Sequence, residues 1–487
     1  MNQQRNEISS TRVEKNIKGL IQRTRSAIRV SQVFLQEKIL KNPHYKRYQW
    51  AVWIISLSWA AVLAVQSVPY YTNIMEGKRA YQQGQYIVAE QKFKLALKDS
   101  ESFSSTDPRH VNALNNLAEL YRTQARYSEA GPLYQEVVKI SESLGSSHQG
   151  RSISLNNLAA LLRDEGRYKE AEPVYMKALT IWNENIKRPD DPNLGAILTG
   201  LAKLYRDEGR YKEAEPLYMK ALSIRLKALG PNHPDVAVVY DNLGGLYRDE
   251  GRLVESEKAY KHALAIDELA VGTEHPDTAT DINNLAGLYR DQERYAEAKS
   301  LYNHSLAIRL RIFGSQHPLV AKSLQGLAEL DIAQGQDEEA EKLLEKVLAI
   351  RESALGPNHP DVASALDSLA RLYLNQGKYK RATPILNRAL KIRKLVLPTE
   401  HPDIATTLSK QAEVLSAEGK LLESEKVYQE AQTLLEKSLG PDNLTIAKNL
   451  EKISQLYADE GKLSLSRLAK SRAQSIRHNL LKSGVRQ

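Results

Sequence analysis

A segment of about 42 residues recurs through most of this chain, and this repetition limits the possible fold more than any other feature. The clearest copy starts at Leu201 and reads LAKLYRDEGRYKEAEPLY. Its opening position recurs at Leu117, Leu158, Leu201, Leu243, Leu285, Leu327, Leu369, Gln411 and Ile453, at intervals of 41, 43 and then 42 six times. A shorter copy runs from Gly77 to Ala96. We call this copy the leading unit and number the others one to nine, which gives ten units.

Each unit carries the apolar pattern of two short helices. In unit three, Leu201 and Tyr205 lie on one apolar stripe, Ala214 and Tyr218 lie on another, and Gly209 separates them. One helix pair cannot bury both stripes, so neighbouring pairs must stack on one another. The sequence therefore predicts an all-α fold, an α-solenoid of about ten helix pairs.

An uncharged apolar stretch precedes the repeats. The 19 residues from Trp50 to Val68 contain no Asp, Glu, Lys or Arg, and as a helix they would be about 28 Å long, close to the thickness of a bilayer core. Aromatic residues flank the stretch on both sides. We expect a transmembrane helix at residues 50–71. A buried soluble helix and a cleaved signal peptide are the alternatives, and the 49 residues before the stretch favour an uncleaved anchor.

Charge is concentrated at the two ends of the chain. The net charge is +9, of which residues 1–49 contribute +8 and residues 462–487 contribute +7, so the part between them carries −6. The basic pI therefore gives no reason to expect a nucleic-acid partner. Residues 1–49 are predicted to be a basic cytoplasmic segment, either an amphipathic helix on an anionic leaflet or a loosely ordered tail.

Positive charge near the span predicts its orientation. Lys38, Lys41, Lys46 and Arg47 precede it closely, whereas only Lys78 and Arg79 follow it closely. The positive-inside rule then places the N-terminus in the cytoplasm and the repeats on the other side of the membrane.

The small and large residues of the repeat, Leu-Ala, Tyr, Gly-x-Tyr, Ala and Tyr, resemble the tetratricopeptide repeat. The 42-residue period, the letters HPD before the first helix and ALxIR at the end of the second are similar to the kinesin-light-chain type. The resemblance covers roughly residues 73–480, and with the predicted span the chain looks more like membrane-tethered bacterial proteins that carry such arrays. It implies a right-handed solenoid over residues 73–487, ending in a basic capping helix, on the periplasmic side of the inner membrane. A cytoplasm-facing adaptor resembling kinesin light chain is the alternative.

One arc of the first helices repeats polar residues away from the core positions. In tetratricopeptide arrays this arc lines the concave groove where peptides bind, so the resemblance implies protein or peptide partners, acidic ones if the arginines take part. An Asn amide can hold an extended backbone through its donor and acceptor, and Arg can bind carboxylates. Alternatively, the arginines complement the helix dipole and pair with neighbouring Asp residues. The candidates, all in units one to five, are Asn115, Asn116, Asn156, Asn157, Asn242, Asn283 and Asn284, with Arg122, Arg163, Arg206, Arg248 and Arg290.

Five histidines spaced 42 residues apart each precede a proline: His233, His275, His317, His359 and His401. Equivalent residues of stacked units are too far apart to converge on one metal ion, so the His-Pro pairs are interpreted as helix starts. The chain has no cysteine and no nucleotide-binding or hydrolase motif. We therefore expect no cofactor, no metal, no small-molecule substrate and no enzymatic activity; a metal-binding or enzymatic protein is a remote alternative. In unit six, Asp331 and Asp337 replace residues that are mostly Tyr elsewhere, which predicts weaker stacking there.

Overall fold

The computed structural model describes residues 67–144, 149–186, 190–439 and 443–484, and every regular element in these ranges is helical. Residues 67–82 and α3 (Tyr86–Ser100) form the leading unit. The first helices of units one to nine are α4 (Pro108–Thr123), α6 (Gln149–Asp164), α8 (Pro192–Asp207), α10 (Pro234–Asp249), α12 (Pro276–Asp291), α14 (Pro318–Ala333), α16 (Pro360–Asn375), α18 (Pro402–Ala417) and α20 (Leu444–Asp459). The second helices are α5 (Tyr127–Ser143), α7 (Tyr168–Ile181), α9 (Tyr211–Leu229), α11 (Leu253–Ala270), α13 (Tyr295–Phe313), α15 (Asp337–Leu355), α17 (Tyr379–Val396), α19 (Leu421–Leu439) and α21 (Leu463–Gly484). A π-helix, η2 (Trp182–Ile186), extends α7. The predicted all-α array of ten helix pairs is confirmed for the described residues.

The residue before each proline starts a first helix. In unit seven the Nδ1 atom of His359 accepts a hydrogen bond from the backbone N–H of Asp361 at 3.0 Å, and Pro360 takes the first helical position. The other four histidines of the series cap their helices in the same way. The helix-start interpretation of the His-Pro pairs is therefore confirmed.

A tight turn joins the two helices of each unit. In unit three the turn passes through Gly209, whose φ of +76° is a conformation that side chains disfavour. Units one and five use Ala125 and Glu293 at the same place, with φ of 52° and 60°. The turn is therefore kept even where glycine is absent.

Small and aromatic side chains fill the core between helices. Ala214, Tyr218 and Ala221 of α9 are fully buried in unit three. In unit four a Cβ atom at Gly244 would lie 2.7 Å from the Tyr260 ring, so the helices approach closely enough there to exclude even a methyl group.

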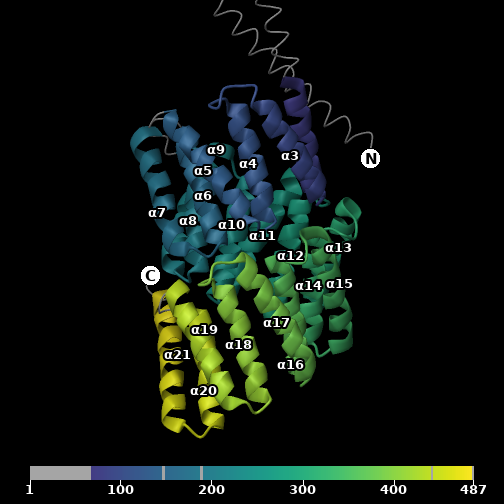
Figure 1. The fold of residues 1–487 in the computed structure, drawn as a ribbon, viewed down its shortest axis with the longest axis vertical. Helices are drawn as coiled ribbons and strands as arrows, with labels where there is room; N and C mark the ends of the chain where they lie inside the picture. The colour runs from purple at the N-terminus through teal and green to yellow at the C-terminus, as the bar shows by residue number, and fades with distance from the viewer. Residues whose placement is uncertain (1–66, 145–148, 187–189, 440–442, 485–487) are drawn as a thin grey trace, which may run out of the picture.

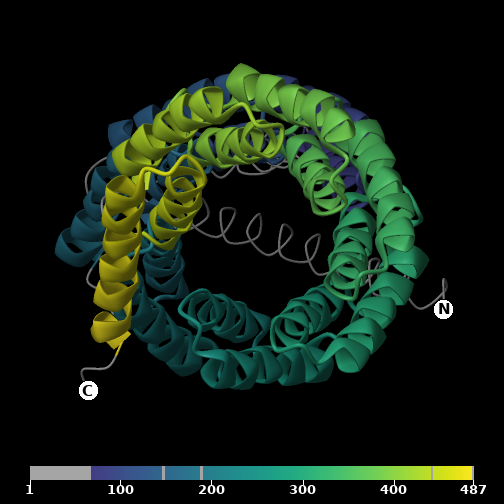
Figure 2. The ribbon, with the colours of Figure 1, turned by 90° about the horizontal axis from the view of Figure 1, so that it is seen from below.

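The units wind into a superhelix with two layers (Figure 1). Seen from its C-terminal end, the chain turns counterclockwise as it comes toward the viewer, which makes the superhelix right-handed (Figure 2). The first helices form the inner layer and the second helices the outer layer, as the C-terminal pair α20 and α21 shows. The winding exceeds one turn, so units six to nine lie against the leading unit and units one to three. The predicted right-handed solenoid is confirmed.

The array begins earlier than the repeat pattern indicated. Tyr70, assigned above to the membrane segment, is only 1% exposed, and its hydroxyl accepts a hydrogen bond from Asn112 at 2.9 Å. The first helix of the leading unit thus includes residues 67–72, ahead of the expected boundary at residue 73. The apolar stretch up to residue 66 and the basic segment 1–49 lie outside the described residues. Within the described ranges, no helix combines the length and apolarity that crossing a bilayer demands.

The last helix, α21, covers the end of the array. Ala469, Ala473 and Ile476 pack into the core of units eight and nine. Lys470, which replaces the aromatic residue of other units, is exposed. The exposed surface of α21 carries Lys470 and other polar side chains together with the exposed Leu463, Leu465 and Leu468, so it covers the end of the array without being wholly polar.

Candidate functional site

The inner layer is braced by polar contacts between successive first helices. The Nδ2 atom of Asn157 lies 3.3 Å from Oδ1 of Asn115, and Asn284 donates to Asp241 at 2.7 Å. In units seven and eight, Asp367 and Lys410 occupy the positions of Asn115 and Asn157. Lys410 lies 3.0 Å from Asp367. The polar arc therefore joins neighbouring units as well as facing inward.

The predicted asparagines fall into two groups. Asn115, Asn116, Asn156 and Asn157 on α4 and α6 are all partly exposed. We call these four the asparagine cluster. Asn156 donates to Asn157 at 3.4 Å, and its own Oδ1 atom is buried without a hydrogen-bond partner in the described residues.

Of the asparagines in units four and five, Asn284 is partly exposed, whereas Asn242 and Asn283 are buried. Asn242 is 8% exposed and donates to the carbonyl of Val238 at 2.6 Å, within its own helix. Asn283 is 7% exposed and its Oδ1 atom lies 3.3 Å from Nη1 of Arg309. Asn115 and Asn116 make the same kind of contact as Asn242, donating to the carbonyls of Val111 and Asn112, so the asparagine cluster differs from Asn242 and Asn283 in exposure and not in freedom from structural contacts. The sequence pattern placed them on the polar arc but could not reveal how closely α13 and the neighbouring first helices cover that arc.

Each predicted arginine binds an acidic residue of the next unit. Arg122 lies 2.6 Å from Asp164, and Arg206 lies 2.6 Å from Asp249. Arg163, Arg248 and Arg290 make the equivalent contacts with Asp207, Asp291 and Glu329. The arginine ladder is thus an inter-unit ion-pair ladder. It agrees with the alternative of pairing with neighbouring acidic residues: Arg163 and Arg290 also contact the Asp that follows them, Asp164 at 2.6 Å and Asp291 at 3.0 Å, and all five arginines have a partner one unit further along the chain.

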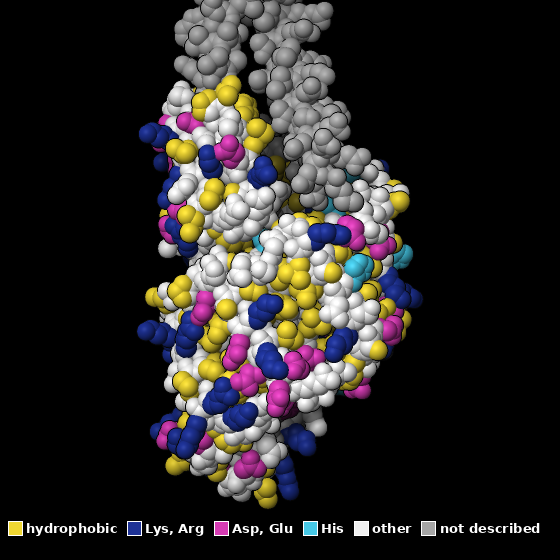
Figure 3. All heavy atoms as spheres, turned by 90° about the vertical axis from the view of Figure 1, so that its right-hand side faces the viewer, with side chains coloured by type: hydrophobic (Ala, Val, Ile, Leu, Met, Phe, Trp, Pro, Cys, Tyr) yellow, Lys and Arg dark blue, Asp and Glu magenta, His cyan; other side chains and the backbone are white. Residues whose placement is uncertain are grey.

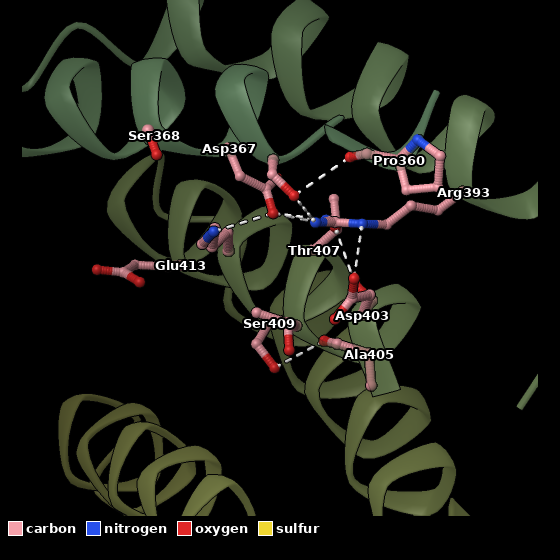
Figure 4. Close-up of polar contacts among 12 residues, drawn as sticks. Pro360, Asp367, Ser368, Arg393, Asp403, Ala405, Thr407, Ser409 and Glu413 are labelled. Carbon is pink, nitrogen blue, oxygen red and sulfur yellow. Dashed lines mark hydrogen bonds and ion pairs between the residues drawn. The ribbon is translucent and has the colours of Figure 1, made fainter. Parts of the chain in front are cut away.

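A second set of arginines, not among the predicted site residues, lies buried between the layers. These are the final residues of the ALxIR pattern, Arg225, Arg309, Arg351 and Arg393. Arg351 donates to the carbonyl of Asp361 at 3.0 Å, in the first turn of the following helix. Arg393 contacts Asp367 at 2.5 Å and also bonds Thr407 (Figure 4). The recurrence of ALxIR was the available signal, and its physical role is to bind each second helix to the next unit.

Unit four breaks this pattern with an aspartate. Asp267 takes the place of the arginine, and it faces Asp281 of α12; each is 4% exposed. Burial, with the neighbouring Asp241 and Asp267 charges, raises the pKa of Asp281 to about 9. Burial and the Asp277 charge raise the pKa of Asp267 to about 6. The two carboxyls therefore share a proton at neutral pH.

Unpaired cations also occur on the first helices. Lys203 and Lys322 form no ion pair with any side chain in the described ranges, and both occupy arc positions. Burial, together with the nearby Arg163 charge, lowers the pKa of Lys203 to about 8. On the outer surface, by contrast, cationic and anionic side chains are intermixed (Figure 3). The described residues contain no group of three or more His and acidic side chains that could hold a metal ion.

Comparison with known proteins agrees with this architecture. Tetratricopeptide-repeat family models match residues 74–144, 150–394 and 403–477, in overlapping copies. No curated protein sequence matches the chain.

Many solved structures are similar to it, and three of them are described below. A putative kinesin light chain with nearly identical TPR-like repeats from Podosopora anserina shares 27% identity over 42% of this chain and 98% of its own, with a TM-score of 0.35. BtubC (BKLC) from P. vanneervenii shares 26% identity over 48% of this chain and 91% of its own, with a TM-score of 0.36. A Rap protein, solved in complex with Competence and Sporulation Factor, has a TM-score of 0.53 and 16% identity over 77% of this chain and 99% of its own. With most of its length matched by the repeat models, the chain belongs to the tetratricopeptide repeat family.

Proposed function

We propose that this protein is a non-catalytic scaffold that binds an extended peptide or protein partner on the inner face of the superhelix, at units one to five. The fold supports protein–protein interaction in general, and the asparagine cluster carries the more specific assignment to this face. Its four amides lie together on adjacent first helices, are partly exposed, and include the unbonded Oδ1 of Asn156.

The chemistry of the cluster suits a peptide backbone. The unbonded Oδ1 of Asn156 carries a desolvation cost of about 1–3 kcal/mol, and because this atom is buried, a donor from a partner removes that cost only if the side chain turns toward the groove. Amide groups accept and donate, so they can hold an extended backbone whatever its side chains. The Rap protein of similar fold, solved with Competence and Sporulation Factor, is an instance of an array of this shape with a bound partner.

Acidic residues of a partner would meet the unpaired Lys203 and Lys322. The five arginines contribute less to this attraction because their charges are already met by Asp and Glu of the next unit. We therefore expect salt to weaken binding moderately through screening.

Substitution of the cluster tests the proposal. Asn115→Ala with Asn157→Ala removes one complete inter-unit contact, so neither change leaves the other amide with a lost partner. We expect capture of the partner from a cell extract to weaken roughly tenfold or more, because about 0.5–1.5 kcal/mol is lost at each of the two positions. Asn303→Ala on the outer-layer helix α13 is the matched control, since Asn303 is exposed. Unchanged capture by the double variant, with the control also unchanged, would place the partner on another face.

We also propose that the apolar stretch from Trp50 up to the start of the array at residue 67 anchors the chain in the bacterial inner membrane, with the array in the periplasm. The uncharged stretch and the excess of basic residues before it support this proposal. To test this, a tag is added after Gln487 and spheroplasts are treated with protease. We expect the protease to cleave the tag. A tag protected until the inner membrane is permeabilised would favour the cytoplasm-facing adaptor instead.

A further inference from the structure

Units six to nine bring the starts of their first helices against turns that lie about 236 residues earlier in the chain. The Nε2 atom of His359 lies 3.0 Å from the backbone oxygen of Thr123, 236 residues away. Asn443 in unit nine donates to the backbone oxygen of Glu208 at 3.0 Å, 235 residues away. His317 and His401 hydrogen bond in the same way to the backbone of Gln82 and Asp164. We call the line where the two superhelical turns meet the seam.

Each histidine at the seam uses both ring nitrogens. The Nδ1 atoms accept from the backbone N–H two residues on, at 3.1 Å in His317, 3.0 Å in His359 and 3.1 Å in His401. Since Nδ1 accepts, the ring proton is on Nε2, where it is donated across the seam. The neutral imidazole therefore satisfies both contacts, whereas a doubly protonated ring cannot accept at Nδ1.

The fit across the seam is close. A Cβ atom at Gly84 would lie 2.7 Å from the His317 ring, and one at Gly166 would lie 2.4 Å from the His401 ring. Apolar residues four positions before the capping residue add to the contact: Leu355 packs against the core of the leading unit and unit one, and Leu439 against that of units three and four. The seam is thus a built interface, repeated once per unit.

Histidines outside the seam provide an internal comparison. His233 and His275 cap their helices identically but contact no earlier turn among the described residues, and their side chains are 41% and 39% exposed. At the seam, His317, His359 and His401 are 6–9% exposed. The same motif is therefore exposed in the first turn and buried in the second.

We infer that His317, His359, His401 and Asn443 are latches that hold the second superhelical turn against the first, and that the three histidine latches open when their rings take up a proton. A proton on Nδ1 removes the acceptor of a capping N–H and places a positive charge at the positive end of a helix. Both changes raise the free energy of the closed seam. When the two turns separate, water can accept from the capping N–H and solvate the charge, so the open state does not carry this cost.

The surroundings of each ring favour the neutral form on balance. Burial is the main cause: it lowers the pKa of His317 to about 4, and it also lowers the pKa values of His359 and His401. The cations Arg309, Arg351 and Arg393, from the preceding helices, act in the same direction, and Asp361 and Asp403, on the latch helices themselves, act against it. The titratable groups on the other side of the seam are three phenols and one carboxylate. The phenols are those of Tyr86, Tyr127 and Tyr168, and the carboxylate is that of Asp164, which forms ion pairs with Arg122 and Arg163.

The pH window follows from these values. An exposed histidine in the open state titrates near pH 6.5, so the open state gains protons before the closed state does. The closed seam is therefore favoured above about pH 6.5 and weakens as the pH falls toward 4. For His317 alone, the closing equilibrium should fall by roughly fifty- to a hundredfold at pH 4.5.

Spin labels placed on either side of the seam test this inference. The full-length chain has no cysteine, so Ser128→Cys and Asn358→Cys, both at exposed positions flanking the His359 contact, can be labelled selectively. Double electron–electron resonance should report a short, narrow distance at pH 7.5 that lengthens and broadens reversibly below pH 6. Labels at Ser128→Cys and Lys169→Cys, both in the first turn, should report an unchanged distance. Widening of both pairs together would overturn the inference, because acid would then be unfolding the units.

The chain supplies a latch that does not titrate, which gives the decisive variant. Asn443 caps Thr445 through Oδ1 at 2.8 Å and crosses the seam through Nδ2. Changing His317, His359 and His401 to Asn should keep the seam closed down to pH 4.5, whereas His233→Asn with His275→Asn should open as the parent does. If the triple variant does not fold, His359→Asn alone should lower the midpoint pH of opening. A parent seam that stays closed at pH 4.5, or a triple or single variant that opens with the parent profile, would refute the role of these histidines.

Discussion

At the scale of single residues, the Asp267–Asp281 pair is the place where this chain departs most from its own pattern. Units three, five, six and seven bind the next unit through a buried arginine, whereas unit four places one carboxyl against another. Because the pKa values of both carboxyls are raised in the folded protein, Asp267 and Asp281 keep protons there that they release in the unfolded chain from about pH 4 upward. The contribution of this pair to the free energy of unfolding should therefore fall as the pH rises from 4 to 9, which is the opposite of the usual behaviour of a salt-bridged Asp.

Asp281→Asn should remove this dependence. We expect the variant to raise the free energy of unfolding by roughly 1–3 kcal/mol at pH 8, because a neutral amide replaces a buried acid. Urea unfolding followed by circular dichroism at pH 5, 7 and 8 measures the effect. Glu268→Gln, an exposed neighbour of Asp267, is the control. A variant that is less stable than the parent at pH 8 would contradict the assignment of a shared proton.

At the scale of helices and units, one contact recurs and unit six lacks it. In most units a Tyr of the first helix donates to a Glu of the preceding second helix, and an Arg lies over the Tyr ring; Tyr205 donates to Glu172 at 2.8 Å and Arg210 lies 3.9 Å from the ring centre. Unit six has Asp331 and Gln336 in the places of Tyr and Arg. Lys299 stands in the place of Glu and lies 4.0 Å from Asp331. The charges at this interface are thus reversed, and the aromatic contact is missing.

Hydrogen exchange should therefore be faster in residues 320–350 than in 196–226. Stability in such an array is approximately a sum of unit and interface terms, so the unit with the poorer interface opens more often. Mass spectrometry of exchanging peptides makes the comparison. The combined change Lys299→Glu, Asp331→Tyr and Gln336→Arg should slow exchange in unit six by restoring the contact of the other units. Equal protection of the two segments in the parent would contradict the expectation of a weak unit.

The helix pairs and their inner and outer faces could be predicted from the sequence because both depend on local periodicity. The partners of the polar residues could not. Arg206 and Asp249 are 43 residues apart, and their contact depends on the angle between successive units. The seam is harder still, since His359 and Thr123 meet only after small rotations have accumulated over nearly six units. Capping by His-Pro was visible in the sequence, but its second role required the superhelix.

At the scale of the whole molecule, the start of the array determines how the membrane proposal should be tested. A fragment of residues 67–487 keeps Tyr70 and its contact with Asn112, whereas a cut at residue 72 would remove a buried part of the leading unit. We expect the 67–487 fragment to be soluble and helical, and the full-length chain to sediment with membranes after a carbonate wash. If the fragment sediments equally after the wash, the attachment does not lie in residues 1–66.

The repetition of the seam contact has a consequence for how such a chain can change in length. The capping residue of each unit from six to nine contacts a turn that is six units earlier, and His233 and His275 carry the same cap without contacting an earlier turn in the part of the chain that the structure describes. If gene duplication or deletion altered the array by one whole unit, every cap would meet the neighbouring turn instead, and the two turns would still close. Loss of part of a unit would misalign all of the contacts at once. Insertions and deletions of complete 42-residue units should therefore keep the seam contacts, whereas partial ones should not.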